Sequence, residues 1–292
     1  MRWVTYYRNL ECRPGAVVAD SNGVDRVVDA AEACPGSPDS LQQLLASGDA
    51  VIANVWDKCQ AGDGPALAEV ALAPPIVTPQ KILCVGLNYA DHAAETGATV
   101  GEEPVIFNKL PTCLRGHDQA IELPPESSKV DFEAELVAVI GKAARRVSRA
   151  AALEHVAGYC CGHDVSARDW QKHKPGGQWL LGKSFDSFAP LGPWIATVDE
   201  LGDPANLPIQ FRLNGEVMQN SSTSQLIFPV DFLVSYLSHV CTLMPGDLIY
   251  TGTPPGVGAA RKPPVFMQPG DVAEVTIEGL GTLRNPVVAA PS

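Results

Sequence analysis

The chain has 292 residues, of which 46% are hydrophobic and 18% charged, a composition typical of a globular protein with a substantial core. Acidic residues outnumber basic ones by 33 to 21, and the net charge of -12 argues against a nucleic-acid-binding surface, which needs clustered Lys and Arg. No apolar stretch reaches the roughly 20 residues of a membrane-spanning helix. We therefore expect neither nucleic-acid nor membrane partners.

The first residues and the cysteines bear on the cellular compartment. Residues 1–7 alternate like a β-strand and lack the apolar core of a secretory signal. The eight cysteines form no CxxC pair and no framework spacing, so free thiols are a better interpretation than disulfides or a zinc site. These features predict an intracellular protein, which we place in the cytoplasm.

The N-terminal part differs from the rest of the chain in its pattern of predicted strands and helices. Its predicted elements are strands over residues 2–7 and 15–19 and a helix over residues 40–45. A proline-rich stretch over residues 72–79 cannot be helical and separates this part from the longer remainder. We predict a small domain over residues 1–73 and a larger one over residues 74–292.

Short apolar runs separated by Gly, Pro, Asn and Asp dominate the larger part. Strands are predicted over residues 81–86, 105–108, 133–140, 192–196, 209–213, 247–250 and 272–277. Helices are predicted over residues 149–156, 166–172 and 230–238. The helices do not alternate regularly with the strands, so the pattern predicts an α+β fold that is mostly β.

Two carboxylates stand close together in one predicted strand. Glu133 and Glu135 are two residues apart, so they point to the same side of the strand, and an apolar run comes directly after them. Like charges in a poorly solvated place are unfavourable unless a cation lies between them. The alternative is a solvated edge strand on which Asp131 is a third exposed acid.

A third acid, Asp164, ends the apolar run over residues 156–163, where a strand gives way to a helical turn. Three carboxylates suit a hard, six-coordinate cation, so Mg²⁺ or Mn²⁺ is favoured over Zn²⁺. We predict a metal site formed by Glu133, Glu135 and Asp164. Strand alternation turns His163 away from this site, which favours a place in the core or behind the ligands.

Five motifs occur in the order found in the fumarylacetoacetate hydrolase family, which the chain resembles from about residue 75 to its end. They are Gly86–Glu95, Glu133-x-Glu135, Asp164–Gln171, Gly182–Asp186 and Thr251–Gly258. Runs over residues 178–183 and 261–266 match one group within the family especially well. The resemblance implies a mixed β-sandwich roll preceded by a small N-terminal α/β domain, a homodimer, and Mg²⁺ or Mn²⁺ on the three carboxylates.

The resemblance also implies catalytic residues. His92 and Glu95 match a pair that takes a proton from water or substrate, and Lys183 matches a residue that gives positive charge to a substrate oxygen. In isolation, His92 and Glu95 are an exposed pair on one helical turn, and Lys183 is a surface lysine.

Four further residues match substrate-binding positions in the family: Tyr89, Arg168, Gln171 and Thr253. A guanidinium suits a carboxylate, which supports Arg168, although it could instead brace Asp164 or Asp169.

Two reactions on a small oxo-carboxylic acid fit this set of residues. The first is hydrolysis of a carbon-carbon bond in a 2,4-dioxo acid, an acylpyruvate or diketo-deoxy sugar acid. The alternative is keto-enol tautomerisation or decarboxylation of oxaloacetate, or isomerisation of a hydroxy-diene-dioate. We prefer hydrolysis by a small margin. A non-catalytic binding protein is disfavoured because His92 and Glu95 are present, and a scaffold without a site requires the three carboxylates to face solvent.

Overall fold

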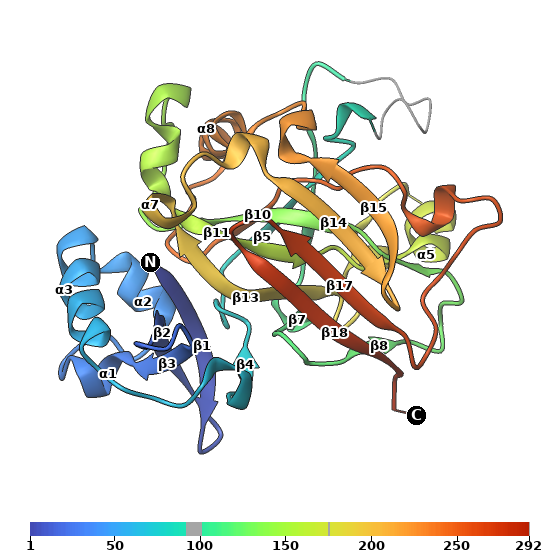
Figure 1. The fold of residues 1–292 in the computed structure, drawn as a ribbon. Coiled ribbons are helices and arrows are strands. Elements are labelled where there is room, and N and C mark those ends of the chain that lie inside the picture. Colours follow the sequence, from blue (N-terminus) through green and yellow to red (C-terminus); the bar gives the residue numbers. More distant parts are fainter. Residues whose placement is uncertain (92–100, 175, 292) are drawn as a thin grey trace.

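The computed structural model describes residues 1–91, 101–174 and 176–291 (Figure 1). Its largest sheet has eleven strands, and the main path runs β3-β2-β1-β13-β11-β10-β16-β5-β6, with β4 on β1 and β7 on β13. The strands of this sheet are β1 Arg2–Arg8, β2 Glu11–Ala19, β3 Asp25–Asp29, β4 Leu72–Ala73, β5 Ile82–Gly86, β6 Val105–Lys109, β7 Leu114–Arg115, β10 Ala134–Ile140, β11 Val156–His163, β13 Ala189–Thr197 and β16 Leu248–Tyr250.

A second sheet of five strands has the order β15-β14-β17-β18-β8. Its strands are β8 Ile121–Leu123, β14 Pro208–Leu213, β15 Glu216–Ser222, β17 Val272–Ile277 and β18 Gly281–Ala289. The two strands β9 Val130–Asp131 and β12 Ser166–Ala167 form a separate pair. In Figure 1 β14, β17 and β18 lie over β10, β11 and β13, so the two sheets form a sandwich.

Helices lie at the margins of this sandwich. Those of the described residues are α1 Ala30–Ala33, α2 Leu41–Ala46, α3 Asp49–Gln60, α5 Arg168–His173, α6 Leu180–Lys183, α7 Val198–Leu201 and α8 Val230–Val240. Residues Arg149–His155, predicted to be α-helical, form a 3₁₀-helix that leads into β11. None of the described helices combines the length and the apolar character needed to cross a membrane.

The sequence has a continuous apolar run after Glu135, and the burial of the central strand β10 explains it. All seven of its residues are buried. Leu136 and Ala138 pack in the core shared with the second sheet, whereas Val137 and Val139 pack on the other face against a cluster that contains Trp3. A strand covered on both faces loses the polar alternation of a half-buried strand.

The N-terminal strands continue the main sheet. Trp3 of β1 pairs with Ile195 of β13. Helices α1, α2 and α3 gather beside β1 to β3 (Figure 1). The division at residue 73 stays a prediction. The α+β, mostly β fold class is confirmed.

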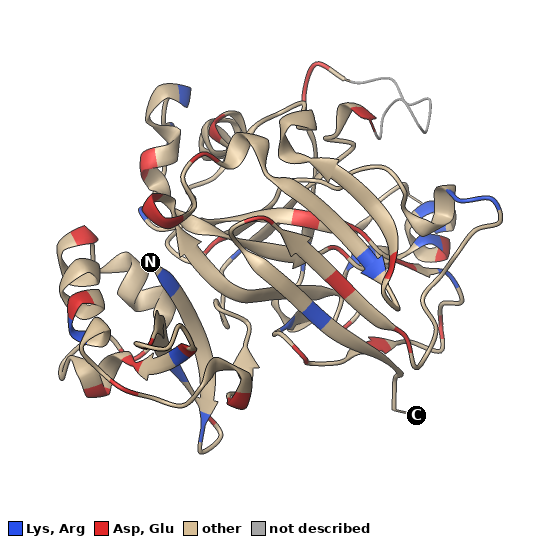
Figure 2. Cartoon of the chain, in the orientation of Figure 1, with Lys and Arg blue, Asp and Glu red and all other residues tan. Residues whose placement is uncertain are grey.

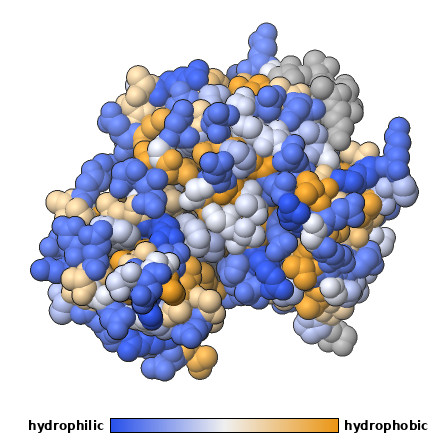
Figure 3. All heavy atoms as spheres, in the orientation of Figure 1, coloured by the Kyte–Doolittle hydropathy of each residue, from blue (hydrophilic) through white to orange (hydrophobic). Residues whose placement is uncertain are grey.

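Hydrophilic residues cover much of the face shown in Figure 3, and hydrophobic residues form small separate patches on it. All eight cysteines are free, and five of them are buried.

Candidate metal centre and active site

Three carboxylates meet at one end of the pair β10 and β11. Glu133 precedes β10, Glu135 lies within it, and Asp164 comes directly after β11. The strands are antiparallel, and the amide of Asp164 donates to the carbonyl of Glu133 at 3.0 Å, which brings the ends together. One ligand oxygen from each lies within 4.8 Å of the others, and the three side chains are buried. This geometry removes the solvated-edge alternative.

Glu135 lies close to two other buried carboxylates. Burial, followed by the neighbouring Asp164 and Glu133, raises its pKa well above the usual range. The amide of Gly252 donates to Glu135 Oε2 at 2.7 Å and fixes the carboxylate. The position therefore favours either a proton or a bound cation.

Lys183 lies at the C-terminal end of α6 and faces the site. Its Nζ donates to Glu133 Oε2 at 2.8 Å and to Asp164 Oδ2 at 2.7 Å. Burial alone would lower the pKa of Lys183, but Asp164 and Glu133 hold that pKa above its usual value. Lys183 is therefore a buried ammonium ion, and the surface alternative does not apply.

Arg168 begins α5 and supports the same cluster. Its guanidinium donates to Asp131 Oδ2 at 2.7 Å, to Glu133 Oε1 at 2.6 Å and to Gln171 Oε1 at 2.9 Å. It braces Glu133 and Asp131, and neither Asp164 nor Asp169 is among its partners. Burial alone would raise the pKa of Glu133, but Lys183 and Arg168 hold it well below its usual range.

Asp131 was considered only as an exposed acid, yet it is fully buried. Besides Arg168, it accepts hydrogen bonds from the amides of Gly258 at 2.7 Å and Ala259 at 3.0 Å. It therefore ties α5 to the loop after β16. The period-two spacing with Glu133 was the available signal for its inward direction.

Lys109, at the end of β6, was not predicted. Its fully buried Nζ lies 2.7 Å from Asp164 Oδ1 and donates to the carbonyls of Val165 at 3.1 Å, Lys183 at 2.5 Å and Phe188 at 2.8 Å. It holds the segments that carry Asp164 and Lys183 together. These partners are 55 to 79 residues away, so no local pattern indicates them.

The donor set fits a divalent cation. Within the described cluster four buried carboxylates, of Asp131, Glu133, Glu135 and Asp164, face three cations, of Lys109, Arg168 and Lys183. One negative charge is left over when all are ionised, and Glu135 is the carboxylate of the four that has no ion pair with a described residue. Carboxylate oxygens have lone pairs beyond those used by lysine and arginine, and hard oxygen ligands suit Mg²⁺ or Mn²⁺.

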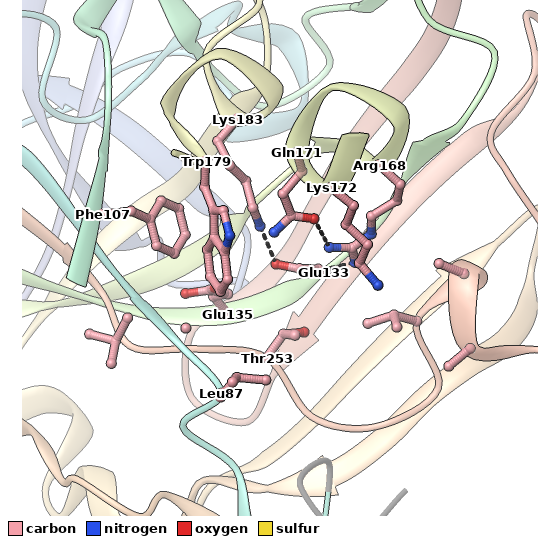
Figure 4. A pocket seen from close by; sticks show the side chains of 15 residues that line it. Leu87, Phe107, Glu133, Glu135, Arg168, Gln171, Lys172, Trp179, Lys183 and Thr253 are labelled. Carbon is pink, nitrogen blue, oxygen red and sulfur yellow. Dashed lines mark hydrogen bonds and ion pairs between the residues drawn. The ribbon is translucent and has the colours of Figure 1, made fainter. Parts of the chain in front are cut away.

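A pocket of about 450 Å³ opens above two of the carboxylates (Figure 4). Its lining residues are Val85, Gly86, Leu87, Phe107, Glu133, Glu135, Arg168, Gln171, Lys172, Trp179, Lys183, Thr253, Val257, Ala259 and Ala260. Phe107 and Trp179 meet edge to face at 5.3 Å. A Cβ at Gly86 would lie 2.5 Å from the Trp179 ring, so glycine lets the ring close over the site.

Thr253 lines the pocket and is positioned by Gln219, a residue that was not predicted. Gln219 Nε2 donates to Thr253 Oγ1 at 2.9 Å and to the Pro254 carbonyl at 2.7 Å. Gln219 Oε1 accepts from the Ala134 amide at 2.8 Å. The Thr253 hydroxyl hydrogen therefore remains available for a ligand.

Four residues considered in the sequence remain to be placed: His92, Glu95, Tyr89 and His163. His92 and Glu95 lie outside the described residues. Tyr89 is fully buried and is not among the residues that line the described pocket. His163 is buried against Phe211 with ring centroids 5.0 Å apart, and burial lowers its pKa to about 3.

Comparison with known proteins identifies the protein family to which the chain belongs. Residues 81–288 match the family model described as fumarylacetoacetate (FAA) hydrolase C-terminal. The chain therefore belongs to the fumarylacetoacetate hydrolase family and is an enzyme of that family, as its motifs predicted.

Among individual relatives, the Bos taurus protein named oxaloacetate tautomerase FAHD2A, mitochondrial, is 47% identical over 281 residues, which is 96% of this chain and 86% of that protein. A fumarylacetoacetate hydrolase structure from Exiguobacterium antarcticum has a TM-score of 0.82 and 34% identity over 99% of both chains. A maleylpyruvate hydrolase structure from Sphingobium sp. SYK-6 with manganese and pyruvate has a TM-score of 0.82 and 29% identity over 100% of both chains.

The cytoplasmic location was wrong. Relatives from Xenopus laevis, Bos taurus and Homo sapiens that match 96% of the chain are named mitochondrial. The strand-like pattern of residues 1–7 and the free cysteines had supported the cytoplasm. Neither feature distinguishes the cytoplasm from other reducing compartments.

Proposed function

We propose that the chain interconverts the keto and enol forms of a small 2-oxo dicarboxylic acid, oxaloacetate, with Mg²⁺ or Mn²⁺ on Glu133, Glu135 and Asp164. The observation that carries the proposal is the buried carboxylate cluster at a pocket, within a chain 47% identical to a relative named oxaloacetate tautomerase. A divalent cation, when bound, stabilises the negative charge that develops on the substrate oxygen.

The described residues position the carboxylates, bind the substrate and limit the access of water. Lys183 and Arg168 hold the carboxylates in place through charge-assisted hydrogen bonds. Gln171 uses its carbonyl oxygen for Arg168, so its amide hydrogens are available to a substrate carboxylate, as is the Thr253 hydroxyl. Trp179 and Phe107 limit the access of water to the same space.

Tautomerisation breaks one C–H bond beside the carbonyl and forms one O–H bond, and it consumes neither water nor a redox partner. We assign the proton transfer at carbon to His92, oriented by Glu95. A His92→Ala variant is expected to keep metal affinity and to lose turnover about 100-fold or more, since general acid-base catalysis contributes that much. Calorimetric metal titration and the enol assay measure these two properties, and full turnover would contradict the assignment.

Hydrolysis of a 2,4-dioxo acid is the second candidate, and it was preferred on sequence alone. The likeness to maleylpyruvate hydrolase favours it. The relatives named oxaloacetate tautomerase share more sequence with this chain, so tautomerisation takes precedence. The homodimer implied by the family resemblance is part of the proposal, and sedimentation velocity tests it.

A substrate panel with Mg²⁺ or Mn²⁺ distinguishes the reactions. A tautomerase accelerates the decay of enol-oxaloacetate absorbance without releasing pyruvate. A decarboxylase releases pyruvate and carbon dioxide from oxaloacetate, and a hydrolase releases pyruvate from acylpyruvates. Glu274→Gln, a change on β17 away from the pocket, is the control for Glu135→Gln in each assay.

A further inference from the structure

Three cationic side chains line the described part of the pocket, and two of them form ion pairs with carboxylates. Lys183 is ion-paired with Glu133 and Asp164, and Arg168 with Asp131 and Glu133. The third, Lys172, is exposed at the pocket and forms no ion pair with a described residue. Its positive charge is therefore not neutralised by a neighbouring side chain of the described part of the chain.

Lys172 and Arg168 both lie on α5 and both line the pocket. The two residues are four apart, so they lie on one face of the helix, about one turn of 5.4 Å apart along its axis. Arg168 contacts Glu133, and Lys172 lines the same pocket about one turn farther along α5. Figure 4 shows both side chains running from α5 toward the pocket.

Across the pocket from α5, several of the described lining residues are apolar. Figure 4 shows Leu87, Phe107 and Trp179 on that side. Lys and Arg positions gather around α5 in Figure 2, although the chain as a whole is acidic. Among the described lining residues, Lys172 of α5 is the cation that no carboxylate neutralises, so it attracts a second anionic group of a substrate whose 2-oxo acid end lies at Glu133 and Glu135.

We propose that Lys172 binds the second carboxylate of the substrate and so selects dicarboxylic over monocarboxylic 2-oxo acids. This inference rests on the proposed function for the placement of the 2-oxo acid end. It concerns binding and does not require that the bound acid be turned over.

Oxaloacetate and pyruvate form a matched pair of ligands, because pyruvate lacks only the second carboxylate. Isothermal titration calorimetry of the full chain with Mg²⁺ gives the ratio of their dissociation constants, with pyruvate formed by decarboxylation measured in the same samples. Lys172→Met should weaken oxaloacetate binding about tenfold and leave pyruvate binding unchanged, which corresponds to about 1.4 kcal/mol.

Two further variants act as controls. Lys172→Arg should retain the preference for oxaloacetate. Lys174→Met removes the same charge two residues away, where the ammonium lies 4.0 Å above the Trp170 ring centroid, and should match the wild type. Because Lys172 is exposed, the preference should also decline as ionic strength rises.

The outcomes separate the two proposals. Selective binding that depends on Lys172, without enol turnover, supports this inference and contradicts the tautomerase. Turnover with an unchanged binding ratio in Lys172→Met contradicts this inference alone. Equal weakening of both acids, no preference in the wild type, or binding of neither acid also overturns it.

Discussion

Glu135 makes metal binding and protonation compete at a single residue. In the folded, metal-free protein, burial and the neighbouring carboxylates raise its pKa. Between the ordinary Glu pKa of about 4.3 and that raised value, the folded protein keeps a proton that the unfolded chain has lost. Its free energy of unfolding therefore falls as pH rises through this window.

Glu135→Gln removes that titration and one oxygen ligand. The variant should become more stable relative to wild type as pH rises, measured by urea unfolding without metal from about pH 5 to pH 8. Its metal affinity should fall more than about 100-fold, since even residues behind the ligands contribute 10- to 100-fold. Parallel stability curves for the two proteins, or unchanged metal affinity, would show that Glu135 is not the strained ligand.

Lys109 provides a second prediction at the residue scale. Lys109→Met removes one partner of Asp164 and one donor from each of three buried carbonyls, so it should cost about 3–5 kcal/mol in the free energy of unfolding. Lys142→Met removes an exposed pair with Asp49 and should cost less than about 1 kcal/mol. Similar costs in urea titrations would show that Lys109 has no special structural role.

Among the elements, the loop after β16 shapes the site through backbone geometry. Gly252 has φ +107°, and a Cβ there would lie 2.8 Å from Asn88 Cβ and 3.1 Å from the Val85 carbonyl. Gly252→Ala should therefore shift the amide that holds Glu135 and reduce metal affinity about tenfold, as for other groups that orient ligands.

Gly270→Ala is the matched control for this loop. Gly270 has φ +98°, but a Cβ at this position would have no neighbour within 4 Å, so the substitution adds backbone strain of about 1–3 kcal/mol without a clash. It should lower stability and spare metal affinity in the same calorimetric titration. Equal metal affinity in both variants would contradict the positioning role of Gly252.

The elements also show why the sequence predicted some strands and missed others. β10 and β11 are covered on both faces and are therefore largely apolar, which makes the carboxylates near their ends visible in the sequence. β15 is a half-exposed edge strand with the polar sequence EVMQNSS, and β18 contains Pro286, so neither shows a strand pattern. Lys109 and Gln219 were missed because their partners are brought together only by the tertiary fold.

At the scale of the whole molecule, the N-terminal part and the main sheet share one core. Trp3, Leu41 and Ile82 belong to the same buried cluster as Val137 of β10. The chain should therefore unfold in one transition, with tryptophan fluorescence and far-ultraviolet circular dichroism giving the same midpoint. Trp3→Ala should lower the free energy of unfolding by about 3–5 kcal/mol. Two separated transitions would indicate that residues 1–73 are an independent unit.

At the same scale, the three carboxylates are proposed to bind a divalent cation for enolisation without bond cleavage. The most direct measurement follows enol-oxaloacetate decay and pyruvate release together, with and without Mg²⁺ or Mn²⁺, for wild type, Glu135→Gln and Glu274→Gln. We predict metal-dependent decay without pyruvate in wild type and Glu274→Gln, and loss of that activity in Glu135→Gln. Decay that is independent of metal, or equally fast in Glu135→Gln, would contradict this role of the carboxylates.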